Sequence, residues 1–103
     1  MAILKINNFV NRCYDNNDGI IIYKQLVHLI KEAQITKEKV KISFQGFDFV
    51  TTSFINSAFV QLLEKFDIDD IINYTTIIDS NVSINYAIKN RIFSASQAKY
   101  VAV

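Results

Sequence analysis

Three hydroxyl side chains, Thr51, Thr52 and Ser53, follow one another in the stretch "FVTTSFINSAF" at residues 49–59. They lie between a segment with strand-like alternation and a segment with apolar residues at helical spacing. A Ser or Thr at a helix start can accept a hydrogen bond from a backbone N–H group, which stabilises the helix by about 1 kcal/mol. The same N–H groups and the positive helix end stabilise an anion, so a phosphate on Thr52 or Ser53 would be tolerated. The pattern thus predicts either a helix cap or a hydroxyl that is phosphorylated or contacts a partner.

A second polar group, Arg12 with Asp18 and Gly19, lies in the loop that follows the first predicted strand. In a parallel sheet this loop and residues 51–53 meet at the same edge, where ligands and partners usually bind. Arg12 is therefore a candidate to bind a carboxylate or a phosphate there. The alternative is a structural ion pair between Arg12 and Asp15 or Asp18.

No set of residues typical of catalysis is found in the sequence. Cys13 is the single cysteine and His28 the single histidine. The sequence therefore offers few ligands for a metal site, and a histidine-based catalytic triad would depend on His28 alone. Glycine-rich phosphate-binding motifs and a nucleophile elbow are absent from the sequence. We therefore expect a protein that is not an enzyme, with no catalytic residue, no metal and no cofactor.

Composition and charge restrict the class of partner and the compartment. The formal net charge is +1, with basic and acidic residues interspersed, so we expect no nucleic acid and no anionic membrane as partner. No run approaches the roughly 18 apolar residues of a membrane span, and the lone cysteine favours a reducing cytoplasm. Frequent Ile, Lys and Asn, with no Pro or Trp, indicate an A+T-rich bacterial or phage genome.

The elements that must position these residues alternate between strand and helix periodicity, which predicts an α/β domain in βαβαβα order with about three helices. The strands are expected at residues 3–10, 40–44 and 71–79. The helices are expected at residues 18–34, at 53–66 and after the capping residues 79–81. Helical crossovers predict a mainly parallel sheet, which an extra short strand would make mixed. Residues 1–103 form one domain in this interpretation, with 97–103 as a frayed tail or an edge strand.

The stretch "VKISFQGFDFVTTSFINSAFVQLLEKF" at residues 40–66 resembles the central strand, turn and helix of STAS domains, the fold of bacterial anti-sigma-factor antagonists. Arg12, the pair "DG" at 18–19, "SF" at 53–54 and "AF" at 58–59 resemble, more narrowly, a STAS-like family of unknown function. Members of that family are often encoded beside a histidine-kinase-like ATPase. The resemblance spans roughly residues 3–93 and implies a small STAS-like domain.

The resemblance also implies roles for individual residues. In the antagonists an Asp-Ser pair opens this helix, and its serine accepts phosphate from a partner kinase. That pair falls on Thr51 and Thr52, so the acceptor position keeps a hydroxyl while the Asp is replaced, and the glycine expected two residues later is Phe54. The narrower family has acidic residues where this chain has Asn56 and Ser57.

Three hypotheses follow. The first is a non-enzymatic regulatory module that binds a cytoplasmic protein, such as a histidine-kinase-like ATPase, and is switched by Ser or Thr phosphorylation. Its binding or switch residues would be Thr51, Thr52, Ser53, Phe54, Asn56 and Ser57. The alternative is a small anion- or nucleotide-binding domain with a pocket at the helix start near Arg12. A third is a homo-oligomer assembled through Phe47, Phe49 or Phe54.

Overall fold

The structure is a computed structural model that describes residues 2–101 of the chain, with side chains as far as residue 98. Three short strands form one parallel sheet in the order β1-β2-β3. Leu4, Ile42 and Ile77 occupy one register row across the sheet. The strands are β1 (Ala2–Lys5), β2 (Val40–Ser43) and β3 (Thr75–Ile78).

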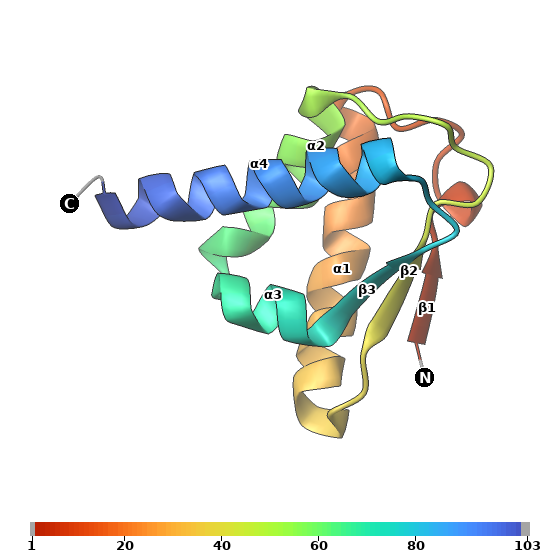
Figure 1. Ribbon diagram of the computed structural model, residues 1–103. Helices are drawn as coiled ribbons and strands as arrows, with labels where there is room; N and C mark the ends of the chain where they lie inside the picture. The colour runs from red at the N-terminus through yellow and green to blue at the C-terminus, as the bar shows by residue number, and fades with distance from the viewer. Residues whose placement is uncertain (1, 102–103) are drawn as a thin grey trace.

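Four α-helices lie on one face of this sheet (Figure 1). Successive right-handed crossovers in one direction place α1, α2 and α3 on the same side, and α4, which follows the last strand, packs there against α2, η2 and α3. Two short 3₁₀ helices, η1 and η2, complete the fold. The helices are η1 (Ile6–Asn8), α1 (Asn16–Thr36), α2 (Thr52–Ala58), η2 (Val60–Glu64), α3 (Ile68–Tyr74) and α4 (Val82–Val101).

The domain is thus a mixed α/β fold with a parallel sheet, but the simple βαβαβα order is only roughly matched. The second crossover holds three helical pieces where one helix over 53–66 was predicted, because α2 ends at Ala58 and the chain continues as η2. The predicted strand 71–79 is only 75–78, and the residues before it form α3. Asp69 and Asp70 lie in the first turn of α3, where carboxylates favour helix formation.

Both ends of the chain also differ from the prediction. The first strand ends at Lys5 because the chain turns into η1, which buries Ile6. At the other end α4 continues through Val101, so residues 97–101 are helical and form no edge strand. Residues 102–103, which belong to the same prediction, lie outside the described part. Over the described residues no helix is long and apolar enough to cross a membrane.

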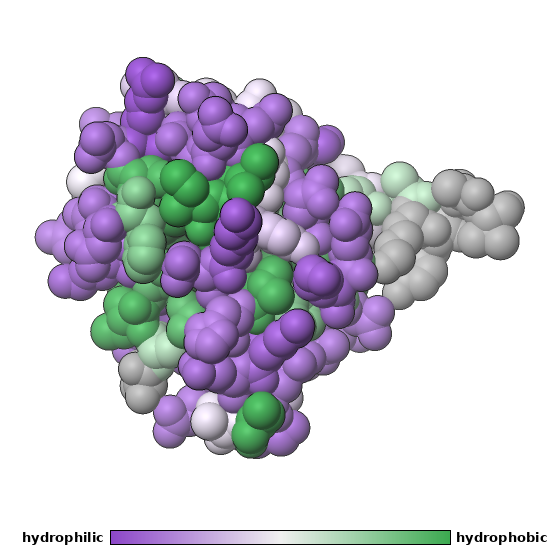
Figure 2. Space-filling model, turned by 180° about the vertical axis from the view of Figure 1, so that it is seen from behind, coloured by the Kyte–Doolittle hydropathy of each residue, from purple (hydrophilic) through white to green (hydrophobic). Residues whose placement is uncertain are grey.

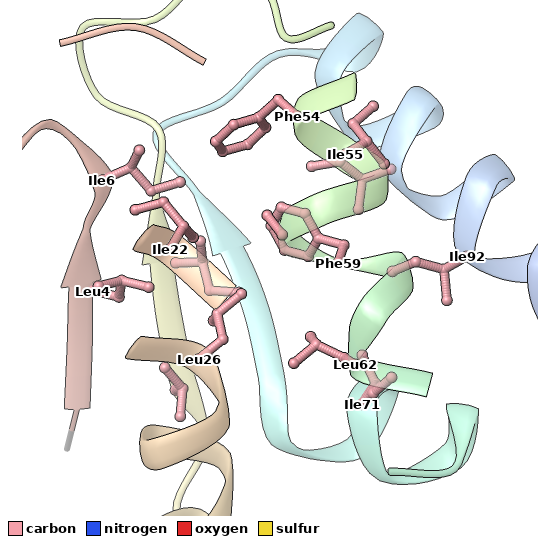
Figure 3. Packing of buried hydrophobic residues seen from close by; sticks show 14 of the residues in the cluster. Leu4, Ile6, Ile22, Leu26, Phe54, Ile55, Phe59, Leu62, Ile71 and Ile92 are labelled. Atoms are coloured by element: carbon pink, nitrogen blue, oxygen red, sulfur yellow. The ribbon is translucent and has the colours of Figure 1, made fainter. Parts of the chain in front are cut away.

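The core lies between the sheet and the helices (Figure 3). Leu4 and Ile6 point toward Ile22 of α1, and Phe54 and Phe59 approach the sheet from the α2 side. All five are at most 2% exposed, and burial of a side chain of this size stabilises the fold by about 1.5–3 kcal/mol. Seen from behind, the molecular surface is mainly hydrophilic, with several separate apolar areas (Figure 2).

Candidate functional site

The Thr51 side chain joins the start of α2 to the loop that precedes α1. Its Oγ1 accepts a hydrogen bond from the Phe54 N–H at 3.2 Å, which makes Thr51 the N-cap of α2. Its hydroxyl donates to the Tyr14 carbonyl, and its backbone N–H donates to the Cys13 carbonyl at 3.1 Å. Thr51 therefore has the cap role that the sequence left open, and its hydroxyl is already engaged.

Thr52 and Ser53 occupy the first turn of α2, and both are exposed. Neither hydroxyl has a hydrogen bond within the part of the chain that the structure describes. Phe54, in contrast, is fully buried and packs edge-on against Phe59. The Thr52 and Ser53 hydroxyls are thus exposed to solvent, whereas the Phe54 side chain belongs to the core.

The start of α1 is fixed by two carboxylates. Asp15 is the N-cap, and its Oδ1 accepts from the Asp18 N–H at 2.9 Å. In return Asp18 Oδ2 accepts from the N–H groups of Asp15 and Tyr14 at 3.3 and 3.2 Å. This is a capping box, and in it Asp18 holds the loop that carries Arg12.

Gly19 allows α1 and α2 to cross closely. A Cβ atom at this position would lie 2.5 Å from Ser57 Cβ and 2.9 Å from the Phe54 carbonyl oxygen. The Ser57 hydroxyl donates to Asn16 Oδ1 at 2.9 Å across the same crossing. The predicted meeting of the loop after the first strand with residues 51–53 is seen in the bonds of Thr51 to Cys13 and Tyr14. The contact of Gly19 with Ser57, which was not predicted, holds the two helices together.

Arg12 contacts an aromatic ring. The ion pair with Asp15 or Asp18, which was one of the two alternatives predicted for Arg12, is not formed among the described residues. Its guanidinium lies 5.2 Å from the centroid of the Tyr14 ring, and Tyr14 stacks on Phe49 with 5.1 Å between ring centroids. Tyr14 and Phe49 are 41% and 53% exposed. We call Arg12, Tyr14, Phe49, Thr52 and Ser53 the α2-start surface.

Cys13, between Arg12 and Tyr14, is fully buried. Burial, with a smaller contribution from the negative charge of Asp18, raises the pKa of the Cys13 thiol from 9.0 to about 12. The thiol is therefore neutral at physiological pH and poorly suited to nucleophilic chemistry. Among the described side chains no three His, Cys, Asp or Glu residues are grouped so that they could hold a metal ion.

Arg91 on α4 is a residue that the sequence did not single out. Its Nε and Nη2 donate to Asn56 Oδ1 at 3.2 and 2.9 Å, which ties α4 to α2. Asn56 stands where the resemblance places an acidic residue, and that family carboxylate is the signal from which a neighbouring arginine could have been inferred. Arg91 thus binds a neutral amide, and the Asn56 side-chain oxygen is engaged in a contact within the domain.

The hypothesis of an anion pocket near Arg12 stays a prediction. An apolar groove of about 490 Å³ is present in the molecule, but it lies between β3, α3 and α4 and contains neither Arg12 nor Ser53. The homo-oligomer hypothesis also stays a prediction. Of its three phenylalanines Phe54 is buried, which leaves Phe47 and Phe49 at least partly accessible.

Comparison with known proteins completes the description of the site. The family model of the STAS-like domain of unknown function (DUF4325) matches residues 18–85, more than half of the 103-residue chain. The matched segment contains Asp18, Gly19 and residues 51–57, while Arg12 and Arg91 lie outside it. No curated protein and no solved structure matches the chain. The chain belongs to the family of STAS-like domains of unknown function.

Proposed function

We propose that this STAS-like domain is a non-enzymatic regulatory module that binds another protein through its α2-start surface. The observation that supports the proposal best is the exposed stack of Arg12 on Tyr14 and of Tyr14 on Phe49. Arginine and aromatic residues are the types that most often dominate the energy of protein–protein interfaces. In this domain they stand beside the exposed hydroxyls of Thr52 and Ser53.

The rigidity of the base beneath this surface also supports binding. Thr51 ties the loop of residues 13–14 to α2 by backbone and side-chain hydrogen bonds, and Gly19 brings the two helices into close contact. A surface that is already held in its binding conformation loses less entropy when a partner binds. The α2-start surface is therefore built for recognition of a folded protein partner.

The partner we propose is a histidine-kinase-like ATPase, the class of protein that the family resemblance implies. Phosphorylation of Thr52 or Ser53 would then act as the switch. A phosphate adds close to two negative charges at neutral pH, and within a packed interface desolvation and repulsion weaken binding. Thr51 is not an acceptor in this proposal, because its hydroxyl already caps α2 and contacts the Tyr14 carbonyl.

The first experiment identifies the partner by affinity purification from the native cell and then measures its affinity by calorimetry. We expect the double variant Tyr14→Ala, Phe49→Ala to bind at least about tenfold more weakly, as loss of aromatic interface anchors usually does. The matched control is Ile35→Ala, since Ile35 is 82% exposed at the opposite end of α1. Equal affinity of the wild type and the double variant would contradict the proposed surface.

The switch is tested separately on the same complex. We expect Thr52→Glu or Ser53→Glu to weaken binding, while Thr52→Ala and Ser53→Ala keep nearly the wild-type affinity. Mass spectrometry of the purified native protein shows whether either hydroxyl carries phosphate. Two results together would contradict the switch: Glu variants that bind the partner as tightly as the wild type, and native protein with no phosphate on Thr52 or Ser53. The surface would then bind its partner without regulation by phosphorylation.

A further inference from the structure

The free edge of β3 is open to another strand. Within residues 2–101 β3 pairs only with β2, and the Phe44 N–H donates to the Ile78 carbonyl at 3.1 Å. Ile78 therefore turns its backbone groups toward β2. Since every second residue of a parallel strand bonds to a given neighbour, Thr75 and Ile77 turn theirs toward the free edge. The backbone of β3 thus offers hydrogen-bonding groups that β2 does not use.

The two edges of the sheet differ in how they are protected. Natural proteins usually protect an edge strand with charged residues, proline or a bulge. The β1 edge ends in the exposed Lys5, whereas β3 consists only of "TTII" at Thr75–Ile78. The β3 edge therefore lacks the charged or proline residues that discourage strand pairing.

The apolar groove lies beside this free edge, between β3, α3 and α4, and we call it the β3 groove. Ile77 and Ile88 line it, together with Ile72 of α3 and Phe93 of α4, which are 50% and 53% exposed. Figure 1 shows α3 near the start of β3 and α4 beginning beyond its end, with α4 continuing past the sheet. Side chains of an added strand that face the helices would be buried in this groove.

Two polar groups in the groove indicate the chemistry of what binds there. Asn85 Oδ1 is buried and has no hydrogen-bond partner among the residues that the structure describes, and such an acceptor is costly unless a donor reaches it. Lys89 also lines the groove, and no carboxylate among the described residues pairs with it. A polypeptide supplies N–H donors that a hydrocarbon chain lacks, and an acidic side chain would complement Lys89.

We infer that the β3 groove binds an extended segment of a partner protein, with alternating apolar residues and an acidic residue, as a strand added to β3. The added strand continues the sheet through hydrogen bonds with Thr75 and Ile77, a known mode of peptide recognition. Its apolar side chains enter the groove, and its carboxylate lies near Lys89. This site shares no residue with the α2-start surface and does not depend on the function proposed for it.

The test uses the full chain and a synthetic heptapeptide, Glu-Val-Thr-Ile-Thr-Val-Glu, blocked at both ends. We expect saturable shifts in the NMR spectrum of the protein, with slower hydrogen exchange at the Ile77 amide, at peptide concentrations up to about 1 mM. Absence of saturable binding in this range overturns the inference. So does binding that shifts only residues outside β3, α3 and α4.

Two N-methylated peptides separate strand addition from simple insertion of apolar side chains. Methyl groups on the second and fourth residues block one edge of the peptide and leave the other free. A second peptide carries its two methyl groups on the third and fourth residues. It has as many methyl groups as the first peptide, but they block both edges. In an added strand parallel to β3, the residues whose side chains enter the groove turn their N–H groups away from β3, in the same direction as those of Ile77. We therefore expect the first peptide to bind like the parent and the second at least about tenfold more weakly, because only a free edge forms a ladder. Equal binding of both peptides overturns strand addition.

Surface variants test the groove itself. Ile72→Lys places a charge in the groove at a half-exposed position and is expected to weaken binding of the parent peptide about tenfold. Val82→Lys is the matched control, because Val82 is 84% exposed and does not line the groove. Circular dichroism confirms that both variants are folded. Equal loss in both variants, or loss in neither, overturns the location.

Discussion

The α2-start surface and the β3 groove lie at different places on one small domain, and they are constructed in different ways. The α2-start surface rests on directional contacts, with Thr51 capping α2 and with Asp15 and Asp18 capping α1. The β3 groove is lined mainly by isoleucine and phenylalanine side chains, and its buried Asn85 oxygen is unpaired. The capping groups beneath the α2-start surface are thus satisfied within the domain and only its exposed hydroxyls stay open, whereas the β3 groove leaves a buried polar group for a ligand.

This difference suggests how each surface would respond to a partner. Hydrogen bonds and the close crossing at Gly19 fix the positions of α1 and α2, so we expect the α2-start surface to bind with little rearrangement. The helices beside the groove have no glycine-mediated close crossing, and a small number of side-chain hydrogen bonds hold them, among them the Asn81 cap of α4, whose amide also donates to the Asp48 carbonyl. Lys37 Nζ donates to the Tyr74 hydroxyl of α3 at 3.4 Å, and Arg91 ties α4 to Asn56. We therefore expect the groove to adjust its width when a strand is added.

The largest effect is expected from Gly19→Ala, which tests the rigidity of the α2-start surface. The new Cβ would lie 2.5 Å from Ser57 Cβ, so one helix must shift. We expect a loss of about 2–3 kcal/mol in the free energy of unfolding, because overpacking outweighs the helix propensity gained, up to about 1 kcal/mol. Urea denaturation followed by circular dichroism measures the change.

Two controls make the Gly19 prediction specific. Asn17→Ala, at an exposed position in the same turn, is expected to change stability by less than about 0.5 kcal/mol. Ser57→Gly added to Gly19→Ala removes the closest atom and should recover part of the loss. If Gly19→Ala is as stable as the wild type, the crossing of α1 and α2 is loose. The α2-start surface would then be no more rigid than the β3 groove.

A smaller effect is expected from Thr51→Val, which removes the cap but keeps the shape of the side chain. Phe54 N–H and the Tyr14 carbonyl each lose a partner, and we expect a loss of about 1–2 kcal/mol in unfolding free energy. Thr52→Val is the matched control and should stay within about 0.5 kcal/mol of the wild type. Thermal and urea unfolding measure the change. If Thr51→Val and Thr52→Val lower the free energy of unfolding equally, the Thr51 hydroxyl has no capping role that the Thr52 hydroxyl lacks.

The sequence predicted the class of fold and the meeting of the two loops. Strand periodicity at 40–44 and helical spacing at 18–34 identified β2 and α1, and the parallel sheet followed from helical crossovers. The parallel arrangement then placed Gly19 and Thr51 at one edge. The "DG" pair at 18–19 was noted, but the close approach of Ser57 that requires the glycine depends on how α1 and α2 pack.

Other features could not be predicted because they depend on tertiary contacts. The apolar run "IINYTTII" at 71–78 fits a strand by composition, yet its first part forms α3, where Ile71 is buried. Arg12 was expected near a carboxylate, and its contact with Tyr14 depends on the loop conformation that Asp18 fixes. The β3 groove is assembled from β3, α3 and α4 together with Ile42 of β2 and Leu62 of η2, so no single stretch of the sequence indicates it.

The smallest effect is expected from Asn56→Asp, which tests how firmly α4 is held beside the groove. Arg91 donates two hydrogen bonds to the Asn56 amide oxygen, and an aspartate would convert them into charge-assisted bonds. Because both side chains are partly exposed, we expect a gain of only about 0.5–1 kcal/mol in unfolding free energy, decreasing with added salt.

The Arg91→Met background decides whether this gain comes from the α2–α4 contact. Without the guanidinium, the Asn56→Asp substitution should add no stability, and a gain that persists would assign the effect to α2 alone. The same pair connects the two surfaces, because Asn56 lies one turn after Thr52 on α2 and Arg91 lies between Lys89 and Phe93 on α4. If Asn56→Asp also changes binding of the strand peptide, α4 moves when the groove is filled, and the groove adjusts in the way that its few polar contacts lead us to expect.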